Sequence, residues 1–222
     1  MSALVSPDGS VLLPLDEDSV HAVAGELRDA GVESIAIGLI HAYANPAHEQ
    51  RVAEILRGHL PEASISLSSE VCPEIREYER QSTTCANAYV QPLMARYLTR
   101  LGERLREDGL TCPFFLMTSG GGLASLDTAI RFPIRLVESG PAGGAILAAR
   151  IAAQMNLDSV VSYDMGGTTA KLSLVDDGEP LTAYSFEAAR QKRFIENSGL
   201  PIRISTIELI EIGAGGGSIA DV

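Results

Sequence analysis

The pattern of apolar and polar residues changes near residue 113. Before it, apolar residues recur at three- and four-residue steps, which is typical of amphipathic helices. A continuous apolar run at Ser34–Ile40 and a second run from Ile65, with a helical segment between them, predict a β-α-β unit with parallel strands. After residue 113 the apolar runs are short and glycine-rich loops follow them. The pattern predicts an α/β protein whose first half is scaffold.

Two helices in the first half are predicted from their boundary residues. Asp16 can cap the first helix, and Gly31 occupies the position where a C′ glycine ends a helix. Asn45 and Pro46 suit the cap and first position of the second helix. The residues expected to face inward are Val20, Val23, Leu27 and Ala30 in the first helix and Val52, Ile55 and Leu56 in the second.

The longest helix is predicted over Glu74–Asp108. Pro92 lies inside it and is expected to kink or divide it, because proline removes a backbone donor and clashes with the preceding turn. The charged run Glu74–Arg80 is interpreted as a solvated face, with a catalytic role for Glu79 or Arg80 as the alternative. An apolar stripe, either core or subunit contact, consists of Ala86, Tyr89, Val90, Leu93, Met94, Tyr97, Leu98, Leu101 and Leu105.

The segment Ser159–Gly178 carries the clearest candidate chemistry. An apolar run ends in Asp164, two glycines and two threonines follow, and an alternating run resumes, so a β-hairpin with a polar tip is predicted. Gly166 and Gly167 can adopt positive φ and leave backbone N–H groups open to an anion, while the carboxylate suits Mg²⁺. The alternative is a simple tight turn.

Three further glycine loops follow apolar runs, at Ser119–Gly122, Ser139–Gly144 and Gly213–Ser218. The second is expected to join a strand at Leu136–Glu138 to a helix at Ala145–Met155, which would present free N–H groups to an anion. Close helix packing is the alternative role of its last two glycines. Four such loops in one half of the chain favour nucleotide phosphate binding over turns alone.

The remaining segments of the second half are predicted from shorter patterns. Leu181–Phe186 can add a strand, Glu187–Pro201 is polar and is expected to be an exposed loop, and Ile202–Ile212 alternates as a long strand that runs into the last glycine loop. The sequence stops at Val222, just after that loop. We therefore expect a piece cut from a longer protein.

Composition limits the partners of the chain. A net charge of −12 leaves no basic surface for nucleic acid or an anionic membrane. No apolar run approaches the ~20 residues that cross a bilayer, and no signal-peptide pattern is present, so a cytoplasmic location is expected. The cysteines Cys72, Cys85 and Cys112 are odd in number, which suits a reducing compartment, and are interpreted as buried thiols. The four histidines lack metal-binding spacing.

Several motifs resemble, in their order along the chain, those of the hydantoinase A/5-oxoprolinase family. The resemblance begins at about Val32 and implies an actin-like or sugar-kinase-like ATPase fold, with mixed sheets, flanking helices and a nucleotide cleft between two lobes. The motifs that carry it are Asn45–Glu49, Arg76–Arg80, Asn87–Pro92, Ser119–Gly122, Glu138–Gly144, Tyr163–Lys171 and Ile207–Ile219.

The resemblance also implies a chemistry. Family members use ATP and Mg²⁺ to hydrolyse cyclic amides, because phosphorylation turns the ring carbonyl oxygen into a leaving group. A second, hydantoinase B-type subunit or domain is the implied partner. An ATP-binding subunit of a ketone (acetone- or acetophenone-type) carboxylase and a non-catalytic actin-like interaction module are the alternatives. Asp164 is expected to hold Mg²⁺ through water and to be the catalytic residue. The expected nucleotide-binding residues are Gly140, Gly143, Gly144, Gly166, Gly167, Thr168, Thr169, Gly215, Gly216, Gly217 and Ser218.

Two departures from the family pattern affect these expectations. Lys171 stands where many members carry Asp, which indicates a different subgroup and substrate. No D-x-G-G-T loop precedes Asp164, so the chain is interpreted as an internal fragment that is inactive alone. Its expected parts are residues 1–112, an α/β region with the long helix, and residues 113–222, the start of an ATPase lobe that is truncated at its C-terminus.

Overall fold

The computed structural model describes residues 2–192, 195 and 198–219. The chain forms two compact units, and each is made from discontinuous segments. Unit 1 consists of residues 1–112, 126–134 and 187–203, and unit 2 of residues 113–125, 135–186 and 204–222. The expected mixed α/β class is confirmed. The expected division into residues 1–112 and 113–222 stays a prediction about domains.

The secondary structure of unit 1 is mostly helical. Its elements are β1 (Leu4–Val5), β2 (Val11–Leu13), α1 (Glu17–Asp29), β3 (Ser34–Ile37), α2 (Ala47–His59), β4 (Ser64–Leu67), α3 (Ser68–Val71), α4 (Glu77–Glu107), α5 (Leu126–Arg131), most of β11 (Phe186–Ala188) and β12 (Leu200–Ile202), with the 3-10 turn η1 (Pro133–Leu136) at its border.

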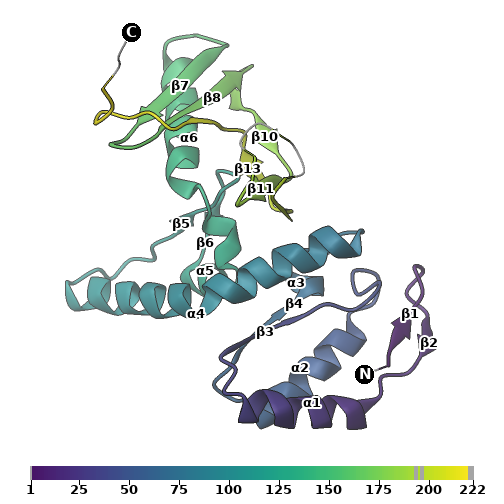
Figure 1. Cartoon of the computed structure of the whole chain (residues 1–222). Coiled ribbons are helices and arrows are strands. Elements are labelled where there is room, and N and C mark those ends of the chain that lie inside the picture. The colour runs from purple at the N-terminus through teal and green to yellow at the C-terminus, as the bar shows by residue number, and fades with distance from the viewer. Residues whose placement is uncertain (1, 193–194, 196–197, 220–222) are drawn as a thin grey trace. The chain divides into compact units, whose positions relative to one another are not determined.

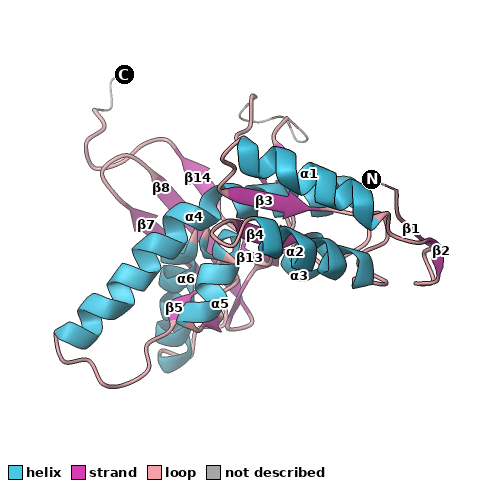
Figure 2. Cartoon of the chain, turned by 90° about the horizontal axis from the view of Figure 1, so that it is seen from below, coloured by secondary structure: helices cyan, strands magenta, loops and turns pink. Residues whose placement is uncertain are grey.

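A β-α-β unit organises the first part of unit 1, as the sequence predicts. β3 and β4 are parallel neighbours with Ile35 opposite Ile65, and α2 connects them. α1 lies beside α2 (Figure 2). The cap of α1 is the predicted one, because the Asp16 carboxylate accepts from the Ser19 N–H at 3.2 Å, and Gly31 has the expected φ of +66°. The first hairpin, β1 with β2, is also present.

The core of this unit is apolar and lies between α1, α2 and the strand pair. The expected Val20 is buried, but Val23 is 41% exposed and Ala24 takes its place in the core. Loss of water contact by these side chains stabilises the unit by roughly 25 cal/mol for each Å² buried. The buried residues are Val20, Ala24, Ile37, Val52, Ala53, Ile55, Leu56, Leu60 and Leu67.

The buried face of α4 is polar, so the apolar stripe is not the core face of this helix, and its role as a subunit contact stays a prediction. Tyr89 is 87% exposed and Leu93 66% exposed, although Leu98 is buried. Pro92 lies inside one continuous 31-residue helix and does not divide it. The polar groups bond to side chains of other elements or to backbone carbonyls; for example, the Asn87 amide donates to Ser66 Oγ at 3.0 Å, and the Thr83 hydroxyl donates to the Glu79 carbonyl at 2.7 Å. The buried positions are Arg80, Thr83, Thr84, Asn87, Ala88, Gln91, Leu98 and Gly102.

Arg80 is fully buried, so the interpretation of its segment as a solvated face was wrong at this residue. Its guanidinium donates to the Ser68 hydroxyl at 3.2 Å and to the carbonyls of Glu74 and Leu39 at 2.8 and 3.0 Å. The same hydroxyl donates to the fully buried Glu49 at 2.6 Å. Because every one of these groups has a partner, the network joins α2, α3 and α4 without an unsatisfied charge.

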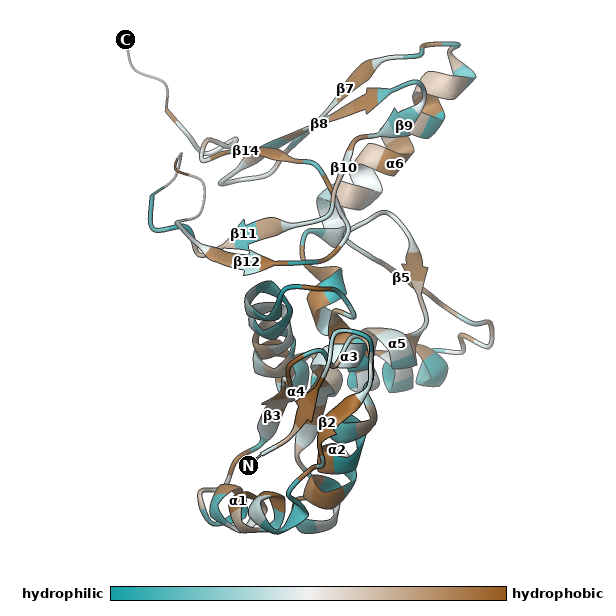
Figure 3. Cartoon of the chain, turned by 90° about the vertical axis from the view of Figure 1, so that its right-hand side faces the viewer, coloured by the Kyte–Doolittle hydropathy of each residue, from teal (hydrophilic) through white to brown (hydrophobic). Residues whose placement is uncertain are grey.

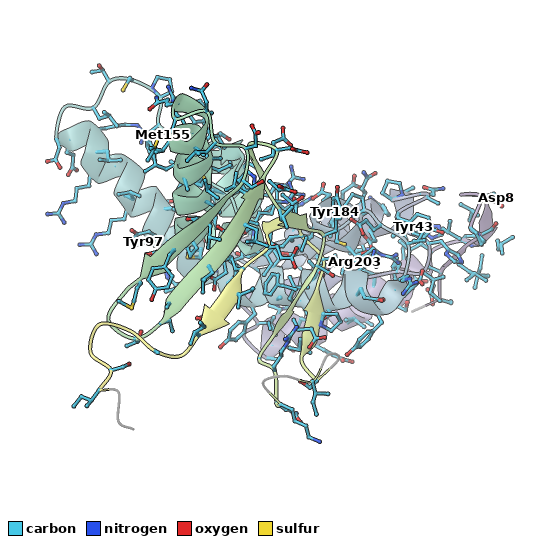
Figure 4. The ribbon with its side chains drawn as sticks, turned by 90° about the horizontal axis from the view of Figure 1, so that it is seen from above. Asp8, Tyr43, Tyr97, Met155, Tyr184 and Arg203 are labelled. Carbon is cyan, nitrogen blue, oxygen red and sulfur yellow. The ribbon has the colours of Figure 1, made fainter. Side chains whose placement is uncertain are left out.

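Unit 2 is built on a sheet with the strand order β14-β8-β7, and β9 extends β8. The helix α6 packs against β7 and β8 (Figure 1). Met155 directly follows this helix (Figure 4). The elements are β5 (Leu116–Met117), β6 (Leu123–Ala124), α6 (Ser139–Gln154), β7 (Val160–Met165), β8 (Ala170–Asp176), β9 (Glu179–Pro180), β10 (Thr182–Ala183), β13 (Thr206–Ile207) and β14 (Ile210–Ile212).

The two faces of this sheet differ in character. On one face, which α6 covers, Val175 and Ser173 are buried. The strands themselves are coloured as hydrophobic over much of their length (Figure 3). On the other face Val161, Tyr163 and Ile210 are 57–61% exposed. Lys171, Ser173 and Val175 are two residues apart along β8, so their side chains lie on the same face of the sheet. Lys171 is therefore on the side that α6 covers.

Two strand predictions for the second half were wrong, and a third is confirmed only in part. Leu136–Glu138 is not a strand, because η1 reaches Leu136 and α6 begins at Ser139. The alternating Ile202–Ile212 segment is broken into parts of three strands that belong to different sheets. The predicted strand at Leu181–Phe186 is present only as β10 and the first residue of β11. The expected loop at Glu187–Pro201 falls partly outside the described residues, and β11 pairs with β12 at its ends.

The cysteines are free thiols, but only Cys72 is buried, so the prediction was wrong for Cys85 and Cys112, which are exposed. Burial, with a contribution from the charge of Glu74, raises the pKa of the Cys72 thiol. Over the part of the chain that the structure describes, no helix has both the length and the apolar character needed to cross a bilayer.

Candidate functional site

The predicted hairpin is present and carries Asp164 beside its tip. β7 and β8 are antiparallel, and Met165 opposite Ala170 is the last pair before the turn. The turn is closed by the Gly166 N–H, which donates to the Thr169 carbonyl at 3.0 Å. Gly167 and Gly166 lack the positive φ that the sequence suggested. Both are exposed, and a Cβ on either would meet no atom within 4 Å, so no side chain encloses the tip.

The last glycine loop lies on this hairpin tip. The Gly216 N–H donates to the Gly166 carbonyl at 3.0 Å, and the Gly217 N–H donates to the Gly167 carbonyl at 3.2 Å. The loop is closed on itself because the Gly215 N–H donates to Ser218 Oγ at 2.9 Å. Two of the glycine loops that the sequence singled out, 46 or more residues apart in the chain, are thus brought into direct contact.

The third candidate segment is the start of a helix and not a loop, which corrects the prediction. α6 begins at Ser139, so Gly143 and Gly144 lie in its second turn, where backbone N–H groups have intrahelical acceptors. Among the described residues, the N–H groups of Ser139 and Gly140 have no acceptor, whereas Pro141 has no N–H and the Ala142 N–H donates to the Glu138 carbonyl at 3.2 Å. The binding roles of Gly140, Gly143 and Gly144 stay predictions.

The glycines of α6 are not required by packing. A Cβ on Gly140 or Gly144 would meet nothing within 4 Å, and one on Gly143 would only touch Met117 at 3.9 Å. The close-packing alternative is therefore not supported for Gly143 and Gly144.

The remaining glycine loop, between β5 and β6, is a packed hairpin turn. Gly121 has a φ of +81°, and a Cβ on it would come within 2.8 Å of Ile146. A Cβ on Gly120 would come equally close to Ser205. Ser119 is buried, and its hydroxyl donates to the Arg135 carbonyl at 2.7 Å. Its glycines are explained by local structure, and it gives no support to a phosphate site.

A row of charged residues lies beside the hairpin tip. Lys171 on β8 is directly opposite Asp164 on β7 and Glu211 on β14. Its ammonium group is bound to the carboxylate of Glu138, which precedes α6, and lies 3.9 Å from Glu211 Oε1. Sequence reasoning missed this cluster, since Glu138 and Glu211 are 33 and 40 residues from Lys171 in the chain.

The residues present fit a metal-bound phosphate better than a directly held metal. Within the described residues, no three histidine, cysteine or carboxylate side chains form a metal-binding group. Asp164 is exposed and can bind Mg²⁺ through water, with phosphate oxygens completing the coordination. Thr168 and Thr169 add hydroxyls at the tip, and the bare backbone of Gly166 and Gly167 leaves space for an anion.

Comparison with known proteins gives matches over nearly all of the chain. The profile of the family described as Hydantoinase/oxoprolinase matches residues 80–222, and that of the Hydantoinase/oxoprolinase N-terminal region matches residues 2–60. The chain is 35% identical to the caprolactamase subunit alpha of Pseudomonas jessenii over 213 residues, which are 96% of this chain and 29% of that subunit.

Two solved structures share the fold. The nucleotide-free structure of an acetone carboxylase, described as an ATP-dependent system, superposes with a TM-score of 0.80 at 25% identity and covers 96% of this chain and 29% of the other. The ATP-dependent caprolactamase from Pseudomonas jessenii gives a TM-score of 0.78 at 33% identity, with 99% and 30% covered. The chain therefore spans about 30% of the length of the caprolactamase and acetone carboxylase chains that it matches.

Proposed function

The chain belongs to the hydantoinase/oxoprolinase family, and on this basis we propose that it is part of an ATP-dependent enzyme that acts on a cyclic amide. In this proposal unit 2 holds the phosphates of Mg²⁺-ATP. Asp164 binds the metal through water, and the hairpin tip and the loop at Gly215–Ser218 surround the phosphates. The observation that carries the proposal is the pair of hydrogen bonds that joins this loop to the tip.

That contact places the last loop on the hairpin tip, but it uses the N–H groups of Gly216 and Gly217, and the Gly166 N–H donates to Thr169. Phosphate binding needs backbone donors near one point, so in this proposal the N–H groups of Gly167 and Thr168 at the tip serve the anion. A single glycine turn is explained by chain reversal alone. Two glycine loops held together, with space for a Cβ at Gly166 and Gly167, present bare backbone with a carboxylate next to it. The arrangement suits an anion that carries its own divalent cation, since the chain has a net charge of −12 and few cations to offer.

A cyclic amide is the proposed substrate class because its carbonyl carbon is a poor electrophile. ATP bound with Mg²⁺ would phosphorylate the amide oxygen, which makes the carbonyl carbon electrophilic, and water would add to that carbon. The ring nitrogen would then leave as an amine when the C–N bond breaks, and a second water would release phosphate from the acyl phosphate that remains. The relatives named as subunits support a second, hydantoinase B-type subunit as the partner. The role of this chain is to hold the nucleotide, so the fragment alone is expected to be inactive.

An ATP-using subunit of a ketone carboxylase is the second candidate. The observation that favours it is the TM-score of 0.80 with an acetone carboxylase, slightly above the value for the caprolactamase. The two candidates differ in the small molecule whose oxygen is activated. Nucleotide turnover by the complete protein that contains this chain, stimulated by a lactam or 5-oxoproline in one case and by a ketone with bicarbonate in the other, separates them.

The nucleotide site can be tested by calorimetric titration of the 222-residue chain with Mg²⁺-ATP and Mg²⁺-ADP. We expect binding by the wild type, loss of most of it in Asp164→Ala, and no change in Asp158→Ala, which removes an exposed carboxylate from the other end of β7. Absence of binding by the wild type would contradict a nucleotide site built from unit 2 alone. Binding that Asp164→Ala leaves unchanged would exclude the role given to Asp164.

A further inference from the structure

Glu138 occupies the N-cap position of α6 but does not cap the helix. Its backbone has φ 62° and ψ 19°, the left-handed conformation that non-glycine residues seldom adopt, and its side chain makes no hydrogen bond to the helix. A carboxylate at a helix N-terminus normally interacts with the first free N–H groups and with the positive end of the helix dipole. At Glu138 this interaction is replaced by another.

The replacement partner is Lys171. Its ammonium group is bound to Glu138 Oε2, and only 17% of its side chain is exposed. Lys171 also stands between Asp164 and Glu211 in the row across the sheet. It is one of two lysines in the sequence, the other being Lys192. A single compact ammonium group thus lies within 4 Å of two carboxylates, those of Glu138 and Glu211, and its residue is the cross-strand partner of Asp164.

We propose that Lys171 is a positioning residue that acts through Glu138. It draws the Glu138 carboxylate away from α6, so that the N–H groups of Ser139 and Gly140 stay available to an anion. Without the ammonium group, the carboxylate is repelled by Glu211 and Asp164 and is attracted by the start of the helix. It then caps α6 itself and occupies the place of the anion.

The proposal concerns the geometry of α6, and only the identity of the anion, a nucleotide phosphate, rests on the proposed function. The two free amides belong to the first turn, where Pro141 adds no third donor. Lys171 lies on β8 next to the hairpin tip and binds Glu138, which precedes α6. The two amides therefore lie near the same end of the sheet as the tip. The inference therefore adds a residue on β8 whose charge determines whether the helix can take part in phosphate binding.

Amide hydrogen exchange followed by NMR tests this directly in the 222-residue chain without a ligand. In Lys171→Met the Gly140 N–H is expected to exchange about fivefold more slowly, the effect of one new capping hydrogen bond. Lys171→Met/Glu138→Ala should return to the wild-type rate, and Lys171→Arg and the control Lys192→Met should keep it. Exchange that Lys171→Met leaves unchanged, or slowing that persists in the double variant, would overturn the proposal.

Glu138→Ala alone keeps the test decisive if Lys171→Met does not fold. Its Gly140 N–H should exchange at the wild-type rate, because Glu138 does not cap in the wild type. Faster exchange in this variant would mean that Glu138 already caps α6, and would refute the proposal.

The affinity for Mg²⁺-ATP provides the second readout. It should fall about tenfold in Lys171→Met and recover in Lys171→Met/Glu138→Ala, whereas a direct phosphate contact by Lys171 would not be rescued. If the wild type binds no nucleotide, the proposed function fails while the exchange result still stands. If the wild type binds and Lys171→Met binds equally well, the inference about Lys171 fails alone.

Discussion

Gly215 lies so close to Gly167 that a Cβ built on Gly215 would come within 2.6 Å of the Gly167 carbonyl oxygen. Gly215→Ala is therefore expected to lift the last loop from the hairpin tip and to break its two hydrogen bonds with Gly166 and Gly167. Calorimetry should register weaker Mg²⁺-ATP binding, by about thirtyfold if each of the two broken hydrogen bonds removes roughly 1 kcal/mol.

Gly216→Ala is the matched control for this substitution. A Cβ on Gly216 comes no closer than 3.8 Å to the Gly166 carbonyl oxygen, which is ordinary van der Waals contact. The two substitutions add the same methyl group to adjacent residues of one loop. Equal nucleotide affinities of the two variants would contradict the importance of the contact between loop and tip.

Removal of the Arg80 guanidinium should destabilise unit 1 strongly. Arg80→Met keeps most of the side-chain volume but leaves the carbonyls of Leu39 and Glu74 and the Ser68 hydroxyl without their donor. The free energy of unfolding is expected to fall by about 3 kcal/mol, as when one partner of a buried charged network is removed. Urea denaturation followed by circular dichroism measures it.

Arg28→Met serves as the control for Arg80→Met. Arg28 pairs with Asp29 at the surface, where the two side chains are 58% and 74% exposed, so water already satisfies both charges. We expect an unfolding midpoint close to that of the wild type. A comparable loss of unfolding free energy in the two variants would mean that the buried network contributes no more to stability than a surface ion pair.

The carboxyl group of Asp8, in the first hairpin, should have a pKa below its ordinary value. The Ser6 hydroxyl and the Ser10 N–H donate to Asp8 Oδ1 at 2.6 and 2.9 Å and lower the pKa of Asp8 from its ordinary 3.8 to about 2. Because the folded pKa is depressed, the contribution to stability is present above pH 3.8 and is lost as the pH falls towards 2.

An NMR pH titration of the Asp8 carboxyl carbon measures this shift. Ser6→Ala removes the largest cause and should raise the pKa of Asp8 towards its ordinary value, whereas Ser19→Ala, at a hydroxyl that bonds to Asp16, should not change it. A wild-type pKa near 3.8 would contradict the hydrogen bonding of the turn.

The three cysteines should react at different rates. Cys72 is 3% exposed and its pKa is raised by burial, so little thiolate is present and reagent access is poor. Iodoacetamide is expected to modify Cys85 and Cys112 in the folded chain and to modify Cys72 only after unfolding in guanidinium. Mass spectrometry of peptides gives the extent at each site, and rapid labelling of Cys72 in the folded chain would contradict its burial.

Local sequence patterns correctly predicted those elements whose structure depends on residues close together in the chain. The apolar period predicted β3, α2 and β4, and the glycine pair predicted the turn between β7 and β8. They failed at α6, because Ser139–Gly144 has the composition of a loop. There Pro141 is compatible with a first turn, and Ala142 and Ala145 are fully buried, so tertiary packing outweighs the low helix propensity of glycine.

Contacts between distant residues were beyond sequence reasoning. The polar buried face of α4 depends on partners such as the Arg131 carbonyl, which accepts from Asn87 44 residues away. Likewise, no local pattern indicates that Lys171 binds Glu138, although the rarity of lysine in this sequence was an available signal. The candidate site was thus predicted as a set of loops, while their contact and charge arrangement came from the structure.

The contact of β12 with α4 constrains the order in which unit 1 can fold during translation. The Arg203 N–H donates to Thr83 Oγ1 at 2.8 Å, and its guanidinium binds Glu74 at 2.8 Å, so the chain closes loops of 120 and 129 residues. Such closure is slow compared with the local β-α-β unit. During translation, the face of α4 around Thr83 lacks this partner until Arg203 has left the ribosome. A chaperone could bind that face during this time. Pulse-labelled exchange during refolding should therefore protect β3 and β4 before β12.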